Sequence, residues 1–347
     1  MDFRKKLRKG FRKVSHRILT IIYSKKQIQD PLDPREINSV LVVRINYRIG
    51  NILFTTPVLN ALEQQLPHSK IDMIVGAPYT ASLIEGMPQI NQVYSFPRFL
   101  LRRPIRLFKF IKQLNANQYD LLLIPSILSS SDRFFSFVVK SRFKVGFHAS
   151  DVFVPFTHSL PNQGNESHEA LKPLPLMHLL GAGENTNFAK HLDIRLSEEE
   201  KQAAKGMFEP GAIGIFRDAK SEKKIENGWW QDLLDHLKGL QADLKFVDIL
   251  DPNQASPLND QIAFLSEKNL RVLAAKISHL DAFICGDTGP MHLAGSVQIP
   301  TIALFKATSP SFYGTLGAKD LSLDIKDKTA GEVAAIIVDH LKGIESS

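Results

Sequence analysis

One stretch of the sequence, residues 281–306, carries residue types that could hold a phosphorylated ligand. Residues 282–285 form an apolar run that is typical of a strand buried on both faces. A turn and a helix follow this strand. Either Asp287 or Thr288 can serve as the helix N-cap, and Pro290 suits the first helical position, where a missing N–H costs nothing. The pattern predicts a strand–loop–helix unit whose loop is rich in hydrogen-bonding groups.

The chemistry that this loop can perform is anion binding. Gly289 lets a ligand approach the backbone closely, and a helix N-terminus offers free N–H groups and partial positive charge. A phosphate or diphosphate fits such a site. An ordinary, well-capped turn between a strand and a helix is the alternative, and the nearby His292 with the two acceptor side chains favours the ligand site.

The elements that must position this loop alternate between strands and helices along the whole chain. Strands are predicted at 39–45, 71–75, 93–96, 121–124, 211–216, 245–250, 282–285 and 301–305. Helices are predicted at 80–85, 105–114, 132–140, 229–240, 270–280, 291–297 and 330–341. This alternation indicates an α/β fold with doubly wound parallel sheets, and a capping box of Ser197 and Glu200 marks the helix that leads into a second domain.

Composition narrows the class of protein. A chain of 347 residues with 44% hydrophobic and 23% charged residues can bury a large core, and its length suits two domains. The one cysteine, Cys285, excludes a disulfide within the chain and fits a reducing compartment, and no Cys/His cluster predicts a metal site. Residues 1–27 hold ten Lys and Arg and one Asp, so the rest of the chain, with 33 basic and 35 acidic residues, is near neutral. We therefore expect no nucleic-acid partner for the body of the protein.

The basic N-terminal arm has the pattern of an amphipathic helix. Apolar residues recur at helical spacing from Phe3 to Ile22, with Lys and Arg between them, which suits an anionic membrane surface. Its apolar part is too short to span a bilayer, and no signal-peptide cleavage site follows it. A solvated tail or a helix docked on the protein itself is the alternative. A linker rich in Pro and Asp follows at 30–34, so the predicted arm and linker cover residues 1–36.

A second basic and apolar segment spans residues 96–112. Six Lys or Arg residues alternate there with nine large apolar ones. A core helix with a solvated basic face accounts for this pattern, and a second surface for a membrane or an anionic acceptor is the other interpretation.

Two motifs resemble the ADP-heptose:lipopolysaccharide heptosyltransferase family, glycosyltransferase family 9. The first runs from Asp287 through His292 to Ala294 and is followed by Pro300 and Leu304-Phe305. The second is the predicted first strand with Arg44, the loop that ends at Gly50, and Thr55-Thr56-Pro57. Lys223, seven residues before Trp230, resembles the family's lysine with its downstream aromatic residue.

The resemblance covers the chain from residue 39 onward and implies the GT-B fold, in which two Rossmann-like domains face a cleft. It implies an N-terminal acceptor domain, 37–195, and a C-terminal donor domain, 196–347. Members of the family invert the anomeric centre as they move heptose from ADP-L-glycero-D-manno-heptose to the inner core of lipopolysaccharide or lipooligosaccharide, on a lipid A/Kdo-type acceptor. They need no metal for donor binding, and they work on the cytoplasmic face of the inner membrane, to which residues 1–27 would attach this chain peripherally.

By family position, Lys223 and the loop would bind the donor, with Lys223 neutralising the phosphate charge of the leaving group. The donor-binding loop residues are Asp287, Thr288, Gly289, Pro290, Met291 and His292. Arg48, Gly50 and Asn51 would line the acceptor side. The catalytic residues implied are Asn51, Lys223 and Asp287.

Asn51 departs from the family pattern, which has an Asp at this position as the general base. An amide has no basic lone pair near neutral pH, so Asn51 could position an acceptor but could not take its proton. Three hypotheses follow. Another carboxylate, such as Asp287 or Asp132, acts as the base in the heptosyltransferase; the protein uses another nucleotide-sugar donor; or it is a catalytically inert, membrane-attached relative.

Overall fold

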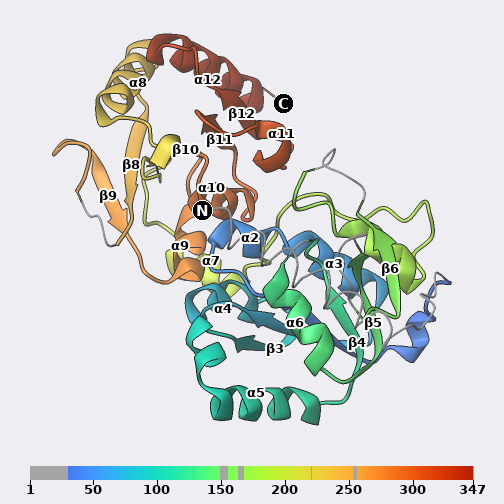
Figure 1. Ribbon diagram of the computed structural model, residues 1–347. Helices are drawn as coiled ribbons and strands as arrows, with labels where there is room; N and C mark the ends of the chain where they lie inside the picture. Colours follow the sequence, from blue (N-terminus) through green and yellow to red (C-terminus); the bar gives the residue numbers. More distant parts are fainter. Residues whose placement is uncertain are drawn as a thin grey trace, which may run out of the picture.

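The chain forms two α/β units joined by a shared core (Figure 1). The computed structural model describes residues 30–127, 129–148, 155–162, 168–219, 221–252 and 256–346, without the side chains of residues 221 and 345. The predicted basic arm, residues 1–27, lies outside the described residues.

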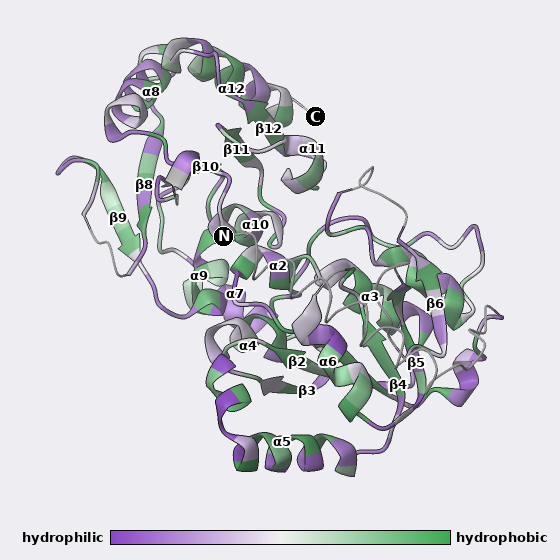
Figure 2. Cartoon of the chain, viewed as in Figure 1, coloured by the Kyte–Doolittle hydropathy of each residue, from purple (hydrophilic) through white to green (hydrophobic). Residues whose placement is uncertain are grey.

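The first unit is built on a six-stranded parallel sheet with the order β3-β2-β1-β4-β5-β6. Its strands are β1 (Ser39–Arg44), β2 (Lys70–Val75), β3 (Ile90–Ser95), β4 (Tyr119–Ile124), β5 (Ser141–His148) and β6 (His158–Pro161). The central strand β1 is apolar along its length, and Val40 to Val43 are completely buried. Central strands of this kind need helices on both faces of the sheet. Figure 2 shows the hydrophobic character of the strands in this sheet.

Helices connect these strands in sequence. They are η1 (Pro34–Glu36), α2 (Ile49–Leu53), α3 (Thr56–Gln65), α4 (Pro78–Glu85), η2 (Arg98–Arg102), α5 (Pro104–Ala116) and α6 (Ser130–Val138). The short helix α2 follows β1 directly, so its residues lie at the carboxyl edge of the sheet, where open α/β sheets bind ligands. Helix α5 connects β3 to β4 and runs along the lower margin of the molecule in Figure 1.

The second unit repeats this plan with the strand order β12-β11-β10-β7-β8-β9, again parallel throughout. Its strands are β7 (Ala212–Phe216), β8 (Lys245–Leu250), β9 (Ala263–Ser266), β10 (Ala282–Gly286), β11 (Thr301–Phe305) and β12 (Leu321–Asp324). Its helices are α8 (Asn227–Leu240), α9 (Leu270–Ile277), α10 (Gly289–Gly295), α11 (Pro310–Tyr313), α12 (Ala330–Glu345) and the short η4 (Ser221–Lys223). Between the two units lie η3 (Leu174–Leu180) and α7 (Glu198–Ala204).

Helices α9 and α10 face the first unit, whereas α8 and α12 pack together on the opposite face of the second sheet (Figure 1). Apolar residues of α9 and α10 therefore share one buried cluster with α2, α3 and α4. Arg271 of α9 is the polar part of this junction. Its buried guanidinium donates to Leu83 O at 3.0 Å and to Ile194 O at 3.1 Å, and it forms an ion pair with Glu200.

The predicted strands and helices are present, with ends that differ by a few residues. The capping box at Ser197 and Glu200 is formed, and Gly181 ends η3 in the left-handed conformation. Four strands were not predicted: β5, β6, β9 and β12. β6, β9 and β12 are edge strands, where one side of the backbone stays open and the apolar pattern is weak. β5 pairs on both sides but is mixed in polarity, and three of the four residues of β9 are exposed.

Candidate active site

The loop between β10 and α10 holds an ion pair that joins residues far apart in the sequence. Asp287 follows β10 directly, and its side chain is 7% exposed. Its Oδ2 accepts hydrogen bonds from Lys223 Nζ at 2.5 Å and from the Thr308 hydroxyl. Lys223 ends η4, and its side chain is 33% exposed. The pair therefore presents an ammonium group to solvent with a buried carboxylate behind it.

The remaining loop residues place backbone rather than side chains at the surface. Thr288 is the N-cap of α10, but its hydroxyl donates back to Gly286 O at 3.3 Å and makes no capping hydrogen bond. Gly289 and Pro290 are half-buried. Met291 is completely buried in the core that the two units share. The side chain of Met291 thus anchors the loop to the shared core.

His292 is also buried, with 5% of its surface exposed. Burial lowers the pKa of His292 to about 3, although the negative charge of Asp287 acts in the opposite direction. The imidazole is therefore neutral near pH 7, and the positive charge beside Asp287 is that of Lys223. Its ring packs edge-on against Phe54 with 4.5 Å between ring centres, and its Nδ1 has no hydrogen-bond partner among the described residues.

The predicted acceptor-side loop meets the donor-side loop directly. A Cβ on Gly50 would lie 2.5 Å from His292 Cδ2, so only glycine allows α2 and α10 to approach this closely. Arg48 is exposed at the start of α2, and Asn51 is half-buried in its middle. Because Phe54 follows Asn51 by three residues in helical conformation, both side chains leave the same face of α2.

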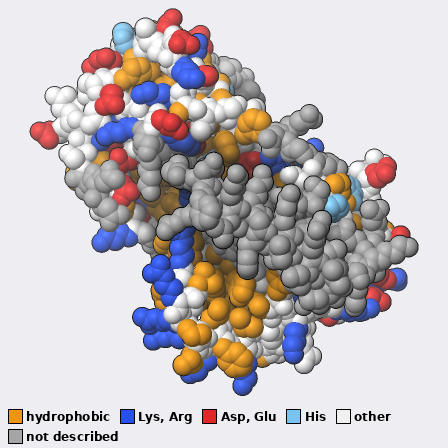
Figure 3. Space-filling model, in the orientation of Figure 1, with side chains coloured by type: hydrophobic (Ala, Val, Ile, Leu, Met, Phe, Trp, Pro, Cys, Tyr) orange, Lys and Arg blue, Asp and Glu red, His pale blue; other side chains and the backbone are white. Residues whose placement is uncertain are grey.

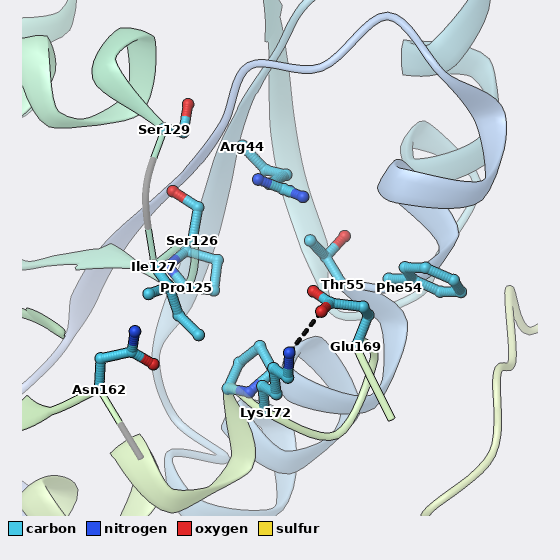
Figure 4. Close-up of a pocket in the computed structure, with 11 residues that line it drawn as sticks. Arg44, Phe54, Thr55, Pro125, Ser126, Ile127, Ser129, Asn162, Glu169 and Lys172 are labelled. Carbon is cyan, nitrogen blue, oxygen red and sulfur yellow. Dashed lines mark hydrogen bonds and ion pairs between the residues drawn. The ribbon is translucent and has the colours of Figure 1, made fainter. Parts of the chain in front are cut away.

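Beside this face lies a pocket of about 270 Å³ (Figure 4). It opens at the carboxyl ends of β1 and β4, and Arg44, Glu169 and Lys172 point into it. It is lined by Arg44, Phe54, Thr55, Pro125, Ser126, Ile127, Ser129, Asn162, Glu169, Lys172 and Pro173. The pocket thus combines two cations, one carboxylate and several uncharged hydrogen-bonding groups.

The segment that carries Glu169 and Lys172 is attached to the second unit. The Glu169 N–H donates to Phe312 O at 3.1 Å, and His168 Nε2 donates to Gly314 O at 2.9 Å. The Glu169 carboxylate pairs with Lys172, yet 37% of the side chain stays exposed. Phe54, which lines the pocket, contacts both His168 and His292 and so connects the pocket with the donor-side loop.

Arg44 is held in the pocket by Asp132, a buried carboxylate on α6. Asp132 Oδ2 lies 3.4 Å from Arg44 Nη1, and Oδ1 accepts from the Ile45 N–H at 2.9 Å. Burial raises the pKa of Asp132, and Arg44 and the hydrogen bonds oppose that shift. With none of its side chain exposed, Asp132 cannot touch a substrate and acts on Arg44 and the backbone.

Sequence reasoning did not find Glu169, Lys172 or Ser126. The signal for Ser126 was available, since it follows directly after a predicted strand end. No comparable signal marked Glu169 and Lys172, which precede η3 in an irregular segment. The described residues contain no group of His, Cys, Asp and Glu that could hold a metal ion.

Comparisons with known proteins agree with this geometry. Residues 107–332 match glycosyltransferase family 9 (heptosyltransferase). The chain is 27% identical over 296 residues to lipopolysaccharide heptosyltransferase 3 of Escherichia coli, covering 76% of this chain and 82% of that protein.

Two solved structures confirm the GT-B fold. The family 9 glycosyltransferase of Veillonella parvula matches with a TM-score of 0.73 at 20% identity, covering 87% of this chain and 90% of that one. The E. coli heptosyltransferase WaaC, solved with ADP-2-deoxy-2-fluoro heptose, matches with a TM-score of 0.71 at 18% identity, covering 87% of this chain and 99% of that one. With the family match spanning well over half of its length, this chain belongs to glycosyltransferase family 9, the heptosyltransferase family.

Proposed function

We propose that this glycosyltransferase moves heptose from ADP-L-glycero-D-manno-heptose to the inner core of lipopolysaccharide or lipooligosaccharide. The observation that carries the proposal is the Lys223–Asp287 pair, a partly exposed ammonium beside the α10 loop and next to α2. The relatives support it, since one is a lipopolysaccharide heptosyltransferase and another was solved with an ADP-heptose analogue.

On the donor side, the ammonium of Lys223 would neutralise the diphosphate as the bond to the sugar breaks. A positive charge fixed where negative charge develops stabilises the transition state without reorganisation. Thr288, Gly289 and Pro290 would approach the donor through the backbone. Met291 and His292 would position that backbone, because their own side chains are buried.

On the acceptor side, the pocket next to Phe54 has the charges that an acidic core sugar requires. Arg44 and Lys172 could pair with the carboxylate of a Kdo-type residue, and Ser126 and Asn162 could bind its hydroxyl groups. The guanidinium of Arg44 is pre-oriented by Asp132, so little freedom is lost when a carboxylate binds. Arg48 and Asn51 would contact the acceptor from α2.

Glu169 is our candidate for the general base that Asn51 cannot be. It lines this pocket, lies on the segment bonded to the second unit, and keeps 37% of its side chain exposed beside its partner Lys172. Of the two carboxylates considered from the sequence, Asp132 is sealed and Asp287 is engaged by Lys223 and Thr308. In the proposed step, the acceptor oxygen attacks the anomeric carbon from the face opposite ADP while its proton passes to Glu169. The bond from that carbon to the diphosphate breaks, and ADP leaves with the electron pair.

We further propose that residues 37–195 form the acceptor domain, that 196–347 form the donor domain, and that residues 1–27 attach the protein to the cytoplasmic face of the inner membrane. Among the described residues, no helix has both the length and the apolar character needed to cross a bilayer. If residues 1–27 contribute to anchoring, their deletion weakens liposome binding and leaves ADP binding intact. Unchanged liposome binding would contradict this role.

The test of the reaction is transfer of labelled heptose from ADP-heptose to heptose-deficient core lipid. Wild type, Glu169→Gln and Asn51→Asp are compared, with calorimetry of ADP binding alongside. General-base catalysis contributes on the order of 10²–10⁴-fold, so we expect Glu169→Gln to lose transfer by at least about 10²-fold and to keep ADP affinity.

Each alternative has its own outcome. A silent wild type that Asn51→Asp activates would identify an inert relative. Transfer from a different nucleotide sugar in a donor screen would identify the other donor. Absence of any ADP or nucleotide-sugar binding would refute the proposed function altogether.

A further inference from the structure

A surface formed by η2 and α5 lies outside the site described above and has no role in it. We define the η2–α5 face by its four exposed apolar side chains and the cations beside them. The apolar ones are Phe99 (49% exposed), Leu101 (56%), Ile105 (74%) and Phe108 (68%). The cations are Arg98, Arg102, Arg103, Arg106, Lys109 and Lys112.

Helix α5 uses only one of its apolar sides to pack against the protein. Leu107, Phe110 and Leu114 face inward at helical spacing, and Leu114 is completely buried. Ile105 and Phe108 leave the helix on another side and stay in solvent. Exposed large apolar side chains that gather in one place mark an interaction site, whereas scattered ones need no explanation. Figure 3 shows hydrophobic and basic side chains together at the lower margin, where Figure 1 places α5.

The charge of this face is of one sign. The sequence contains no Asp or Glu from residue 86 to residue 119. Among the described residues, none of the six cations forms an ion pair; Arg98 and Arg103 instead stack on the rings of Tyr47 and Phe99. Lone cations of one sign beside exposed aromatic and aliphatic side chains are complementary to anionic lipid, in which the charges meet headgroups and the apolar groups enter the boundary with the acyl chains.

We propose that the η2–α5 face docks on an anionic membrane surface. Helix α5 lies flat along the margin of the first unit, so its exposed side can contact a planar surface along its length (Figure 1). A second copy of the chain is a poorer occupant, because pairing two such faces would bring like charges together. The inference is independent of the proposed reaction and of the role proposed for residues 1–27.

The test places an environment-sensitive fluorophore on the face of the full-length chain, through Phe108→Cys. The native Cys285 is completely buried and should not be labelled. A matched control carries the label at Leu240→Cys, an apolar position on α8 that is also exposed (53%). With vesicles of phosphatidylglycerol and phosphatidylethanolamine, we expect a blue shift and quenching by spin-labelled lipid at position 108 and neither change at 240. Vesicles of phosphatidylcholine alone should give no shift.

Two triple charge-reversal variants, one on the face and one elsewhere, measure how much the face contributes to vesicle binding. Arg106→Glu/Lys109→Glu/Lys112→Glu should weaken vesicle partitioning by at least about tenfold, because each cation near an anionic surface adds roughly 1 kcal/mol. Lys326→Glu/Lys328→Glu/Lys342→Glu makes the same change in net charge on exposed residues of the second unit and should bind like wild type.

Two results would overturn the proposal. A protein that sediments with vesicles while the label at 108 stays in water is attached by another segment. A blue shift at 108 that grows with protein concentration in the absence of vesicles would show that a second copy covers the face.

Discussion

Two ion pairs at the carboxyl edges of the two sheets use the same chemistry in different ways. In the first unit, Asp132 is completely buried and is bonded to the backbone N–H of Ile45 as well as to Arg44. In the second unit, the hydrogen-bond partners of Asp287 among the described residues are side chains, those of Lys223 and Thr308. Both pairs hold a cation in front of a shielded carboxylate, but the first carboxylate is also bonded to the backbone, whereas the second accepts from the side chains of Lys223 and Thr308.

We infer from this difference that the two ion pairs have different roles. The exposed fraction of the cation is 33% for Lys223 and 19% for Arg44. In the proposed reaction, the more exposed Lys223 would meet the diphosphate, while Arg44 would offer its guanidinium to the acceptor. Variants of the first pair should mainly change stability, and variants of the second should mainly change catalysis.

The largest effect is expected from Lys223→Ala. Removing a preorganised group that stabilises developing charge costs about 10²–10³ in rate. Because Lys223 is one-third exposed (33%) and Thr308 still donates to Asp287, we expect the variant to stay folded. Steady-state transfer assays and thermal melts measure the two quantities. Lys224→Ala, at the exposed neighbouring position, is the matched control and should keep wild-type activity. Equal losses from both variants would contradict a specific role for Lys223.

The next largest effect is on stability. Asp132→Ala leaves the Ile45 N–H and Arg44 without their partner, so the free energy of unfolding should fall by about 2–3 kcal/mol. Asp132→Asn keeps an oxygen that can accept the Ile45 hydrogen bond and should lose about half as much. Urea denaturation provides the comparison. A stable Asp132→Ala protein that binds ADP normally but transfers no sugar would instead point to a direct catalytic role.

The contact between α2 of the first unit and α10 of the second unit is tested at Gly50. In Gly50→Ala, the new Cβ overlaps the ring of His292, and we expect a loss of about 1–3 kcal/mol in the free energy of unfolding. Gly239→Ala is the control, because a Cβ added there would meet no neighbouring atom within 4 Å and alanine favours a helix, so it should stabilise α8 by about 0.5–1 kcal/mol. An unchanged stability for Gly50→Ala would show that α2 and α10 separate easily.

The smallest effect concerns pH. The pKa of His292 is about 3 in the folded protein and 6.5 as its ordinary value, so the unfolded chain binds the extra proton between these limits. Stability must therefore decrease as pH falls below about 6.5, by about 1 kcal/mol per pH unit from this residue. His292→Gln should reduce the slope of unfolding free energy against pH between 6.5 and 5. A slope equal to that of wild type would mean that His292 is not buried in its neutral form.

Much of the fold could be predicted from the sequence because its central elements are locally distinctive. β1, β10 and β11 have continuous apolar runs that are followed by turn residues, and this pattern needs no tertiary context. The four strands β5, β6, β9 and β12 were missed because their residues are partly exposed or mixed in polarity. The pattern of segment 96–112 also left two interpretations open, a core helix or a membrane surface. The structure shows that one side of α5 is packed while Ile105 and Phe108 are exposed.

The sequence by itself determined the strand–loop–helix motifs around Gly50 and Asp287, since turn residues and apolar periodicity act between near neighbours. Only the tertiary structure decided which of those residues meet. Lys223 reaches Asp287 across 64 positions, and Glu169 shares a pocket with Arg44 because the segment before η3 meets the carboxyl ends of β1 and β4 there. The tertiary structure also decided which side chains are exposed: Lys223 is partly exposed and Asp132 is completely buried. The physical reason is that burial and charge pairing depend on how whole elements pack. Packing brings together residues that are far apart in the chain, and their spacing in the sequence does not predict the contact.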